Sequence, residues 1–322
     1  MKKIVPIYLL IMLTSLAFGQ TEKILNPADL KQQTIVTEPL SLHKGFLRIG
    51  LFYSYAAADK YFSNSGKKIY FPESTWGSSS GVQFWVQYGI SDRFMAEVGI
   101  PYTNDLTNIH FKYLYPEFDT MRIYNASNRG RGIGDMIASA TYQIIPSGEN
   151  KFSLKASLDL TIPTGKKNPT NVVSSDEYNA PTGYGVFTFM PKITARVLSY
   201  PFSYMAYVSY NYNFKGSRIL YPTDTKETKF KYGNSLTAGG SINFHLNEWI
   251  ALVNEINYYY SGKGEIEGVS KSDLNAKWAV SYEPRVVFQL RRFRLGEAVN
   301  IPLKGKMVGA DPLYVLMAQY VF

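Results

Sequence analysis

Residues Arg131–Gly165 read RGIGDMIASATYQIIPSGENKFSLKASLDLTIPTG, and the architecture expected for the whole chain follows from their pattern. Apolar and polar residues alternate strictly over Phe152–Ile162, so that one face of this segment is apolar and the other carries charge. Residues Met136–Ile144 alternate in the same way, with Ile137 as the one exception. The segment therefore predicts two strands joined by a tight turn at Pro146–Lys151.

Both predicted strands are longer than the roughly five or six residues that are usual in a soluble sheet. They match the roughly 9–11 residues that a tilted strand needs to cross a bilayer. Because hydrocarbon cannot satisfy an open sheet edge, strands that cross a membrane have to close into a barrel. We therefore expect an all-β fold, a transmembrane antiparallel up-and-down β-barrel.

The same alternation recurs along the chain, and long and short connections alternate strictly between the predicted strands. Polar segments such as Ala58–Ser78 and Thr103–Gly130 are long, whereas turns such as Ser91–Arg93 are short. This pattern gives about 12 strands in one barrel domain over residues 45–322, with the short periplasmic turns and long external loops of bacterial outer-membrane barrels. A large soluble β-sandwich is the alternative, but a sandwich has no reason to sort its loops by length. Besides the two strands above, the predicted strands are near Phe46–Tyr55, Val82–Ile90, Phe94–Tyr102, Tyr184–Val197, Phe202–Phe214, Tyr232–Leu246, Trp249–Tyr260, Asn275–Leu290, Phe293–Ile301 and Leu313–Phe322.

The N-terminal residues predict export. Lys2 and Lys3 precede the apolar run Ile4–Phe18, and Ala17-Phe18-Gly19 has the small-x-small pattern of a cleavage site, so residues 1–19 are expected to be a secretory signal peptide. Residues 20–44 are polar, and we interpret them as a periplasmic N-terminal arm. The chain has no cysteine, so its stability has to come from burial and a closed hydrogen-bond ladder. Its 26 Tyr and 19 Phe suit the aromatic girdles of outer-membrane barrels.

Short motifs at the strand ends carry a family resemblance. Gly132–Asp135 (GIGD) and Ile162–Gly165 (IPTG) resemble the outer-membrane barrel family named for the MetA pathway of phenol degradation, and Gly99–Tyr102 and Val36–Pro39 fit the same pattern. The resemblance implies a barrel that transports small or aromatic compounds, and it does not imply an enzyme. No helix is expected after the GIGD glycines, so we interpret them as shaping a bulge or bend at the barrel rim, and not as a phosphate loop.

The inward-facing rows of the predicted strands carry charge, which predicts a charged lumen. One interpretation is a lining that selects a polar or amphipathic solute. The other is a set of ion pairs that keeps a narrow interior from collapsing or flooding. A barrel of about 12 strands lies between the filled eight-strand barrels and the open 16-strand porins, so both interpretations stay open. The candidates for this lining are Arg48, Glu97, Asp135, Lys155, Asp159, Lys192, Arg196, Glu255, Glu283 and Arg285.

A search for catalytic groups finds little. The chain has three histidines, His43, His110 and His245, and none has a metal-binding spacing. His245 is expected to face inward, with Ser241 two inward positions earlier, but a hydrolase needs a positioned nucleophile, base and orienting group, and the sequence does not assemble them. We therefore predict no catalytic residue, no metal and no cofactor, and an outer-membrane enzyme is the least favoured alternative.

The expected function is an outer-membrane channel or transporter for passive uptake or efflux of small solutes. A hydrophobic or aromatic solute is implied by the family resemblance alone. The alternative is a structural or surface-interaction barrel with a closed lumen, whose external loops bind a partner.

The expected partners are outer-membrane lipid, the barrel assembly machinery and a small-molecule solute, and basic charge on an exported barrel does not indicate nucleic acid. Alternate aromatic residues in the last strand, ending on Phe322, resemble the signal that the assembly machinery reads. The basic pairs Lys67-Lys68, Arg129/Arg131 and Lys166-Lys167 are expected in external loops, either in contact with lipopolysaccharide phosphates or simply solvated.

Overall fold

The computed structural model describes residues 42, 44–71, 75–115, 120–146, 151–173, 178–219, 223–247, 249–267, 276–290 and 292–322. The predicted signal peptide, nearly all of the predicted arm (with His43) and the side chain of His110 lie outside the described residues. No helix in the described ranges is long and apolar enough to span a membrane.

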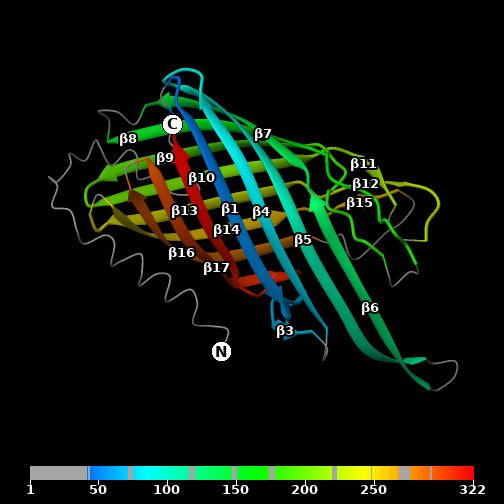
Figure 1. Ribbon diagram of the computed structural model, residues 1–322. Coiled ribbons are helices and arrows are strands. Elements are labelled where there is room, and N and C mark those ends of the chain that lie inside the picture. Colours follow the sequence, from blue (N-terminus) through cyan, green and yellow to red (C-terminus); the bar gives the residue numbers. More distant parts are fainter. Residues whose placement is uncertain are drawn as a thin grey trace.

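In the described part of the chain, twelve antiparallel strands close into one barrel (Figure 1), which confirms the predicted fold. The barrel closes because the first strand pairs with the last one, from Arg48 opposite Val321 to Ala56 opposite Leu313. In order around the barrel the strands are β5 (Phe94–Tyr115), β4 (Trp76–Gly89), β1 (Leu47–Ala58), β19 (Leu313–Val321), β17 (Phe293–Lys306), β16 (Lys277–Leu290), β14 (Ile250–Ser261), β13 (Ser235–His245), β10 (Phe202–Asn213), β9 (Thr188–Ser199), β8 (Phe152–Ile162) and β7 (Met136–Ile145), which pairs with β5 again.

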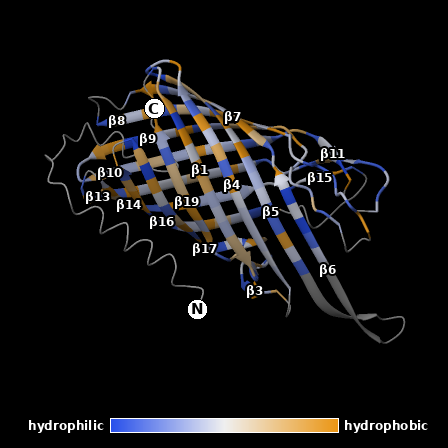
Figure 2. Cartoon of the chain, in the orientation of Figure 1, coloured by the Kyte–Doolittle hydropathy of each residue, from blue (hydrophilic) through white to orange (hydrophobic). Residues whose placement is uncertain are grey.

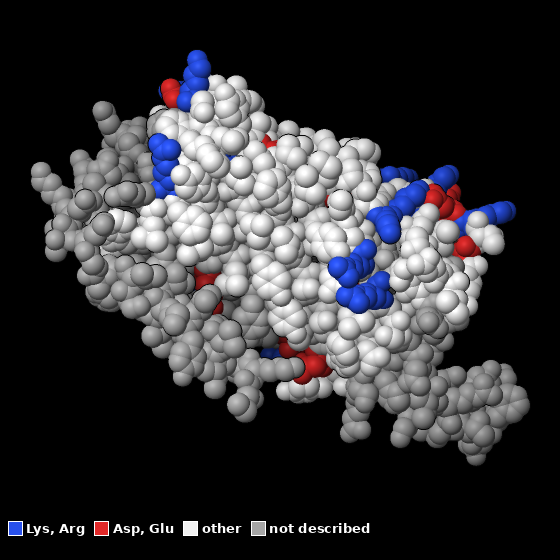
Figure 3. Space-filling view, viewed as in Figure 1, with Lys and Arg blue, Asp and Glu red and all other residues white. Residues whose placement is uncertain are grey.

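The barrel wall is apolar outside and polar inside. On β1, Leu51, Tyr53 and Tyr55 are exposed (46%, 39% and 39%), whereas Arg48 on the opposite face is 6% exposed. Figure 2 shows the resulting alternation of hydrophobic and hydrophilic residues along the strands, and Figure 3 shows a wall that is mostly free of charge. A water-soluble fold would bury this apolar surface, so the exposed row is the surface that faces lipid.

One predicted loop is wrong. Thr103–Gly130 was expected to be an external segment without strands, but β5 continues to Tyr115 and pairs with β6 (Thr120–Ile133). This long hairpin projects beyond the barrel (Figure 1, lower right). Outside the membrane both faces of a hairpin meet water, so the alternation that marks a strand in the barrel wall is lost there. For the same reason β4 begins at Trp76, inside the predicted loop Ala58–Ser78.

Two small sheets organise the long connections at the same end of the barrel, which we take as the extracellular end. One consists of β2 (Lys60–Phe62), β3 (Lys68–Tyr70) and β18 (Val308–Gly309), and the other of β11 (Gly216–Arg218), β12 (Thr228–Lys231) and β15 (Glu265–Ile266). The second sheet is tied to the β8–β9 connection by Glu227, whose carboxylate accepts a hydrogen bond from Lys167 Nζ at 2.8 Å. Hydrogen bonds from Lys167, Ser217 and Asn168 lower the pKa of Glu227 from 4.5 to about 2.

Candidate functional site in the barrel lumen

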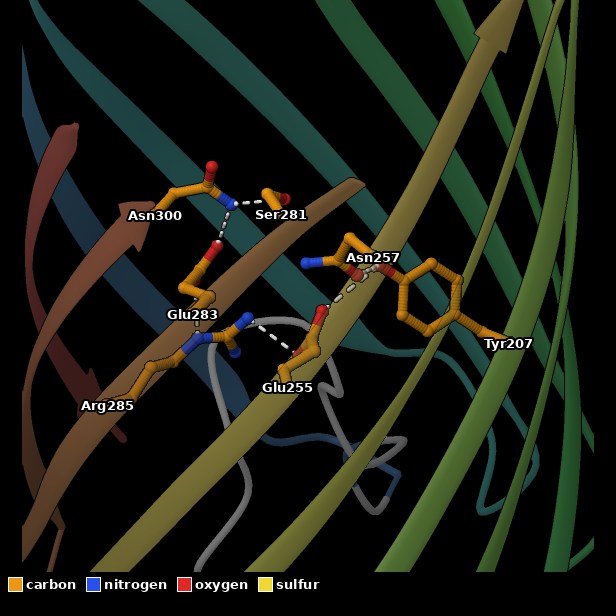
Figure 4. A network of polar contacts seen from close by, with 7 residues as sticks. All are labelled: Tyr207, Glu255, Asn257, Ser281, Glu283, Arg285 and Asn300. Carbon is orange, nitrogen blue, oxygen red and sulfur yellow. Dashed lines mark hydrogen bonds and ion pairs between the residues drawn. The ribbon is translucent and has the colours of Figure 1, made fainter. Parts of the chain in front are cut away.

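A buried ion-pair network lies on the inner wall of the barrel and joins β14, β16 and β17 (Figure 4). Arg285 contacts Glu255 Oε2 through its terminal nitrogen at 2.7 Å and donates from Nε to Glu283 Oε1 at 2.6 Å. The side chains of Arg285 and Glu255 are 1% and 0% exposed. Asn300 Nδ2 donates to the second oxygen of Glu283 at 2.8 Å. Three of the predicted lumen charges therefore form one cluster, in which two carboxylates share a single cation.

Tyr207 extends this network along the inner wall, over β13, to β10. Its hydroxyl donates to Glu255 Oε1 at 3.1 Å and also contacts Asn257 Oδ1. Tyr207 and Asn257 are both register partners of Gly239, which lies on the strand between them. A Cβ at Gly239 would lie 2.7 Å from the tyrosine ring, so the glycine leaves the space in which the ring crosses β13. Tyr207 is uncharged, so a search of the inward rows for charged residues passes over it.

A cavity of about 260 Å³ lies beside the network, on the side of the lumen formed by β19, β1, β4, β5 and β7–β9. Five of the predicted residues line it, and the ammonium group of Lys192 also lies 4.4 Å from the centre of the Tyr207 ring, so the cavity adjoins the network. The lining residues are Arg48, Glu97, Lys155, Asp159 and Lys192, together with Phe52, Gln83, Trp85, Gln87, Ile137, Ser139, Thr141, Ser157 and Gln319.

The cavity also has an apolar side that the search for charged residues missed. The rings of Phe52 and Trp85 stack with their centroids 5.5 Å apart, and Ile137, the one apolar exception in its inward row, lines the same space. Trp85 pairs with Gly50, and a side chain at Gly50 would collide with the indole ring. The signal for this side was present in the sequence, because Phe52 and Ile137 stand at inward positions where polar residues predominate.

Polar contacts fix one acidic and one basic group of the cavity to each other. Arg48 donates to Gln87 Oε1 at 3.0 Å, and Gln87 Nε2 donates in turn to Glu97. Gln87 thus joins the two charges without a direct ion pair. The arrangement offers aromatic rings, hydrogen-bonding amides and both signs of charge to a molecule that enters the cavity.

Two predicted lumen residues, Arg196 and Asp135, lie apart from the network and the cavity. Arg196 is 6% exposed and lies near His245, at the ends of β9 and β13 that lead into the short turns. Ser203 Oγ lies 3.3 Å from His245 Nε2. Ser203 also accepts a hydrogen bond from Asn243 at 2.8 Å.

Asp135 holds a loop at the barrel rim. Its two carboxylate oxygens accept hydrogen bonds from the backbone of Gly165 at 2.9 Å and Tyr184 at 2.6 Å, and it is 6% exposed. Gly165 and Gly183 approach so closely that a Cβ on Gly165 would lie 2.8 Å from the Gly183 backbone. The GIGD and IPTG motifs thus lie together where the β8–β9 connection is attached to the barrel rim.

The expected bend is found at the GIGD motif. β5 pairs with β7 as far as Gly99 opposite Ile137, and with β6 from Tyr102 opposite Ile133. Between these two pairs β5 advances by three residues, whereas the segment opposite, from β6 to β7, advances by four. The extra residue makes a bulge, and Gly132 adopts a φ of 147° there.

Comparisons with known proteins agree with this architecture. An outer-membrane channel from Pseudomonas putida F1 superposes with a TM-score of 0.67 and 14% sequence identity, covering 90% of this chain and 100% of that one. A mutant of the monoaromatic hydrocarbon channel TodX gives a TM-score of 0.49 at 10% identity, covering 92% of each chain. The monoaromatic hydrocarbon channel CymD gives 0.44 at 10% identity, covering 92% of this chain and 91% of that one.

The first of these likenesses establishes the fold of an outer-membrane barrel. No curated protein sequence matches the chain. The family described as "Putative MetA-pathway of phenol degradation" matches residues 69–294, more than two thirds of the sequence. The chain belongs to this family.

Proposed function

We propose that the protein is an outer-membrane channel through which small solutes cross passively. The observation that carries the proposal is the lumen cavity, in which stacked aromatic rings face amides and charges of both signs. Its volume of about 260 Å³ is below the roughly 300–1,000 Å³ of pockets that hold drug-sized ligands, so the solute is expected to be small.

The composition of the cavity favours a solute with an aromatic ring. Phe52, Trp85 and Ile137 provide apolar contact area, and offset aromatic stacking adds about 0.5–1.5 kcal/mol per pair. Transport of monoaromatic hydrocarbons by the TodX and CymD channels is in keeping with such a solute. Passage needs no cofactor and no covalent chemistry, only diffusion past the cavity.

The ion-pair network limits how wide the path is. Arg285 and Glu255 fill their part of the lumen with almost no exposed surface, so we expect a solute to pass along the side that holds the cavity. We therefore expect a conductance well below that of an open porin, and a size limit for the solutes that pass.

Conductance in planar bilayers, combined with liposome swelling against solutes of graded size, tests this function. Changing Glu97→Gln and Asp159→Asn removes negative charge from the cavity, so the reversal potential in a salt gradient should shift toward anion selectivity. Glu267→Gln, on an external loop where the glutamate side chain is 64% exposed, is the matched control and should leave the selectivity unchanged. A folded barrel that neither conducts ions nor admits any of the solutes would refute the proposal.

The β5–β6 hairpin favours the alternative of a surface-interaction barrel, because it projects beyond the wall (Figure 1). Joining Asn108 to its register partner Ser127 through a two-residue turn would shorten the hairpin without shifting its pairing. If binding to intact cells of the same species is lost while permeability is kept, the hairpin has an adhesive role in addition to the channel.

A further inference from the structure

Two arginine side chains project from the same outer face of β6. Arg129 and Arg131 are two residues apart on this strand, and both are exposed. The next residue in their row, Ile133, is apolar and 56% exposed, which places the row on the outer wall of the barrel. Figure 3 shows basic side chains gathered on the wall where β5 and β6 leave the barrel.

These arginines lie where the outer wall changes from apolar to polar. Along the outward row of β5, Val98, Ile100 and Tyr102 are exposed and apolar or aromatic, and Asn104 comes next. A tyrosine at the end of an apolar row is typical of the aromatic girdle at the level of the lipid headgroups. The arginine that pairs with Asn104 is Arg131, so its guanidinium group belongs to this level.

Neutral groups hold both guanidinium groups in place. Arg131 Nε donates to the hydroxyl of Tyr102 at 2.7 Å, and Arg129 Nε donates to Asn104 Oδ1 at 2.9 Å. Asn104 is itself fixed by Nδ2, which donates to Ser80 Oγ at 3.3 Å. Each arginine therefore uses Nε for positioning, and within the described part of the chain its two terminal nitrogens remain available to another acceptor.

A third basic residue, Lys166, is attached to the chain next to the two arginines. The hydroxyl of Thr182 donates to the carbonyl of Ile133 at 2.7 Å and accepts from the backbone N–H of Lys166 at 3.1 Å, so the backbone of Lys166 lies next to the end of β6. The acidic residue nearest along β5, Asp105, alternates to the opposite face and accepts from Ser79. Among the described residues, none forms an ion pair with Arg129, Arg131 or Lys166.

We propose that Arg129, Arg131 and Lys166 form a binding site for the phosphate groups of a phosphorylated glycolipid in the outer leaflet, of the lipid A type. Two positioned guanidinium groups match the bidentate geometry of phosphate, and the lysine adds a point charge. The exposed apolar side chains next to them, Ile133 on β6 and the row Val98, Ile100 and Tyr102 on β5, would contact the acyl chains of the same lipid. The site is on the outer wall, so it does not depend on what crosses the lumen.

Native mass spectrometry of the refolded full-length barrel, titrated with diphosphoryl lipid A, tests the site. Losing the charge-assisted hydrogen bonds in a double variant, Arg129→Gln with Arg131→Gln, should weaken binding by about tenfold or more. The control variant, Lys67→Gln with Lys68→Gln, removes the same amount of charge at the small sheet of β2, β3 and β18, and should bind lipid A like the wild type. Arg131→Lys keeps the charge but not the fork, and an intermediate affinity is expected. Unheated gel mobility verifies that each variant is folded.

The lipid and its parts distinguish a lipid site from a simple anion site. Lipid A with one phosphate should bind more weakly than the diphosphoryl form, and inorganic phosphate should not displace either at equal concentration. Equal binding by the wild type and the folded double variant would overturn the proposal. Full displacement by inorganic phosphate, or equal binding of dephosphorylated lipid A, would overturn it as well.

Discussion

Replacing Arg285 by Met leaves two carboxylates of the lumen without their shared cation. Arg285 and Glu255 are 1% and 0% exposed and lie 2.7 Å apart, and Arg285 also bonds Glu283 at 2.6 Å. Removing one partner of a buried ion pair costs about 3–5 kcal/mol, because the remaining charge stays buried without compensation. We expect the free energy of unfolding of Arg285→Met to fall by this amount, measured by equilibrium guanidinium unfolding in phospholipid vesicles with tryptophan fluorescence.

An exposed ion pair provides the matched control. Lys229 and Glu267 are 73% and 64% exposed and 3.8 Å apart, so Lys229→Met should cost less than about 1 kcal/mol. Adding Glu255→Gln to Arg285→Met removes one of the stranded charges and should recover part of the loss. Equal costs for Arg285→Met and Lys229→Met would refute the argument that the stranded buried charges cause the loss, and so would a double variant less stable than Arg285→Met.

Two further predictions concern a close approach and a titration. Gly239→Ala should destabilise the barrel by about 1–3 kcal/mol because the new methyl group meets the Tyr207 ring. The control Gly240→Ala, whose new methyl group has its nearest contact at 3.4 Å, should be near neutral in the same unfolding assay. Equal effects of the two substitutions would contradict the packing argument. The pKa of Glu227 is lowered to about 2, first by the hydrogen bond from Lys167, so its contribution is present above about pH 4.5 and is lost as the pH falls from there toward 2. Limited proteolysis of the external loops should therefore accelerate over that window in the wild type, and Glu227→Gln should proteolyse fast at every pH; an unchanged pH profile in the variant would contradict this assignment.

The membrane makes the barrel strands predictable from the sequence. β8 covers Phe152–Ile162, the range that the alternation predicts, because every second residue in the wall has to face lipid. The hairpin beyond Thr103 was not predicted, since no difference between inside and outside acts on it. The same physical rule therefore explains both the successes and the failure.

The lumen site was predictable only in part. Alternation places Arg48, Glu255 and Arg285 on the inward face, but not which of them meet. Contact between Tyr207 and Asn257 depends on the registers of three strands and on the absence of a side chain at Gly239. Such relations between strands are set by the closure and shear of the whole barrel, which no local pattern records.

The junction between β1 and β19 has a consequence for the order in which the barrel is made. The other junctions of the barrel join strands that follow one another along the chain, apart from the strands of the external connections. This one joins residues near the two ends of the described chain. Until it forms, two strand edges expose unpaired backbone groups, each of which costs several kcal/mol in hydrocarbon. Strands β4 to β17 can therefore pair early, but the sheet cannot enter lipid alone and stay there. Closure and insertion have to be coupled, and the slow step of biogenesis is expected to be the zipping of this last seam.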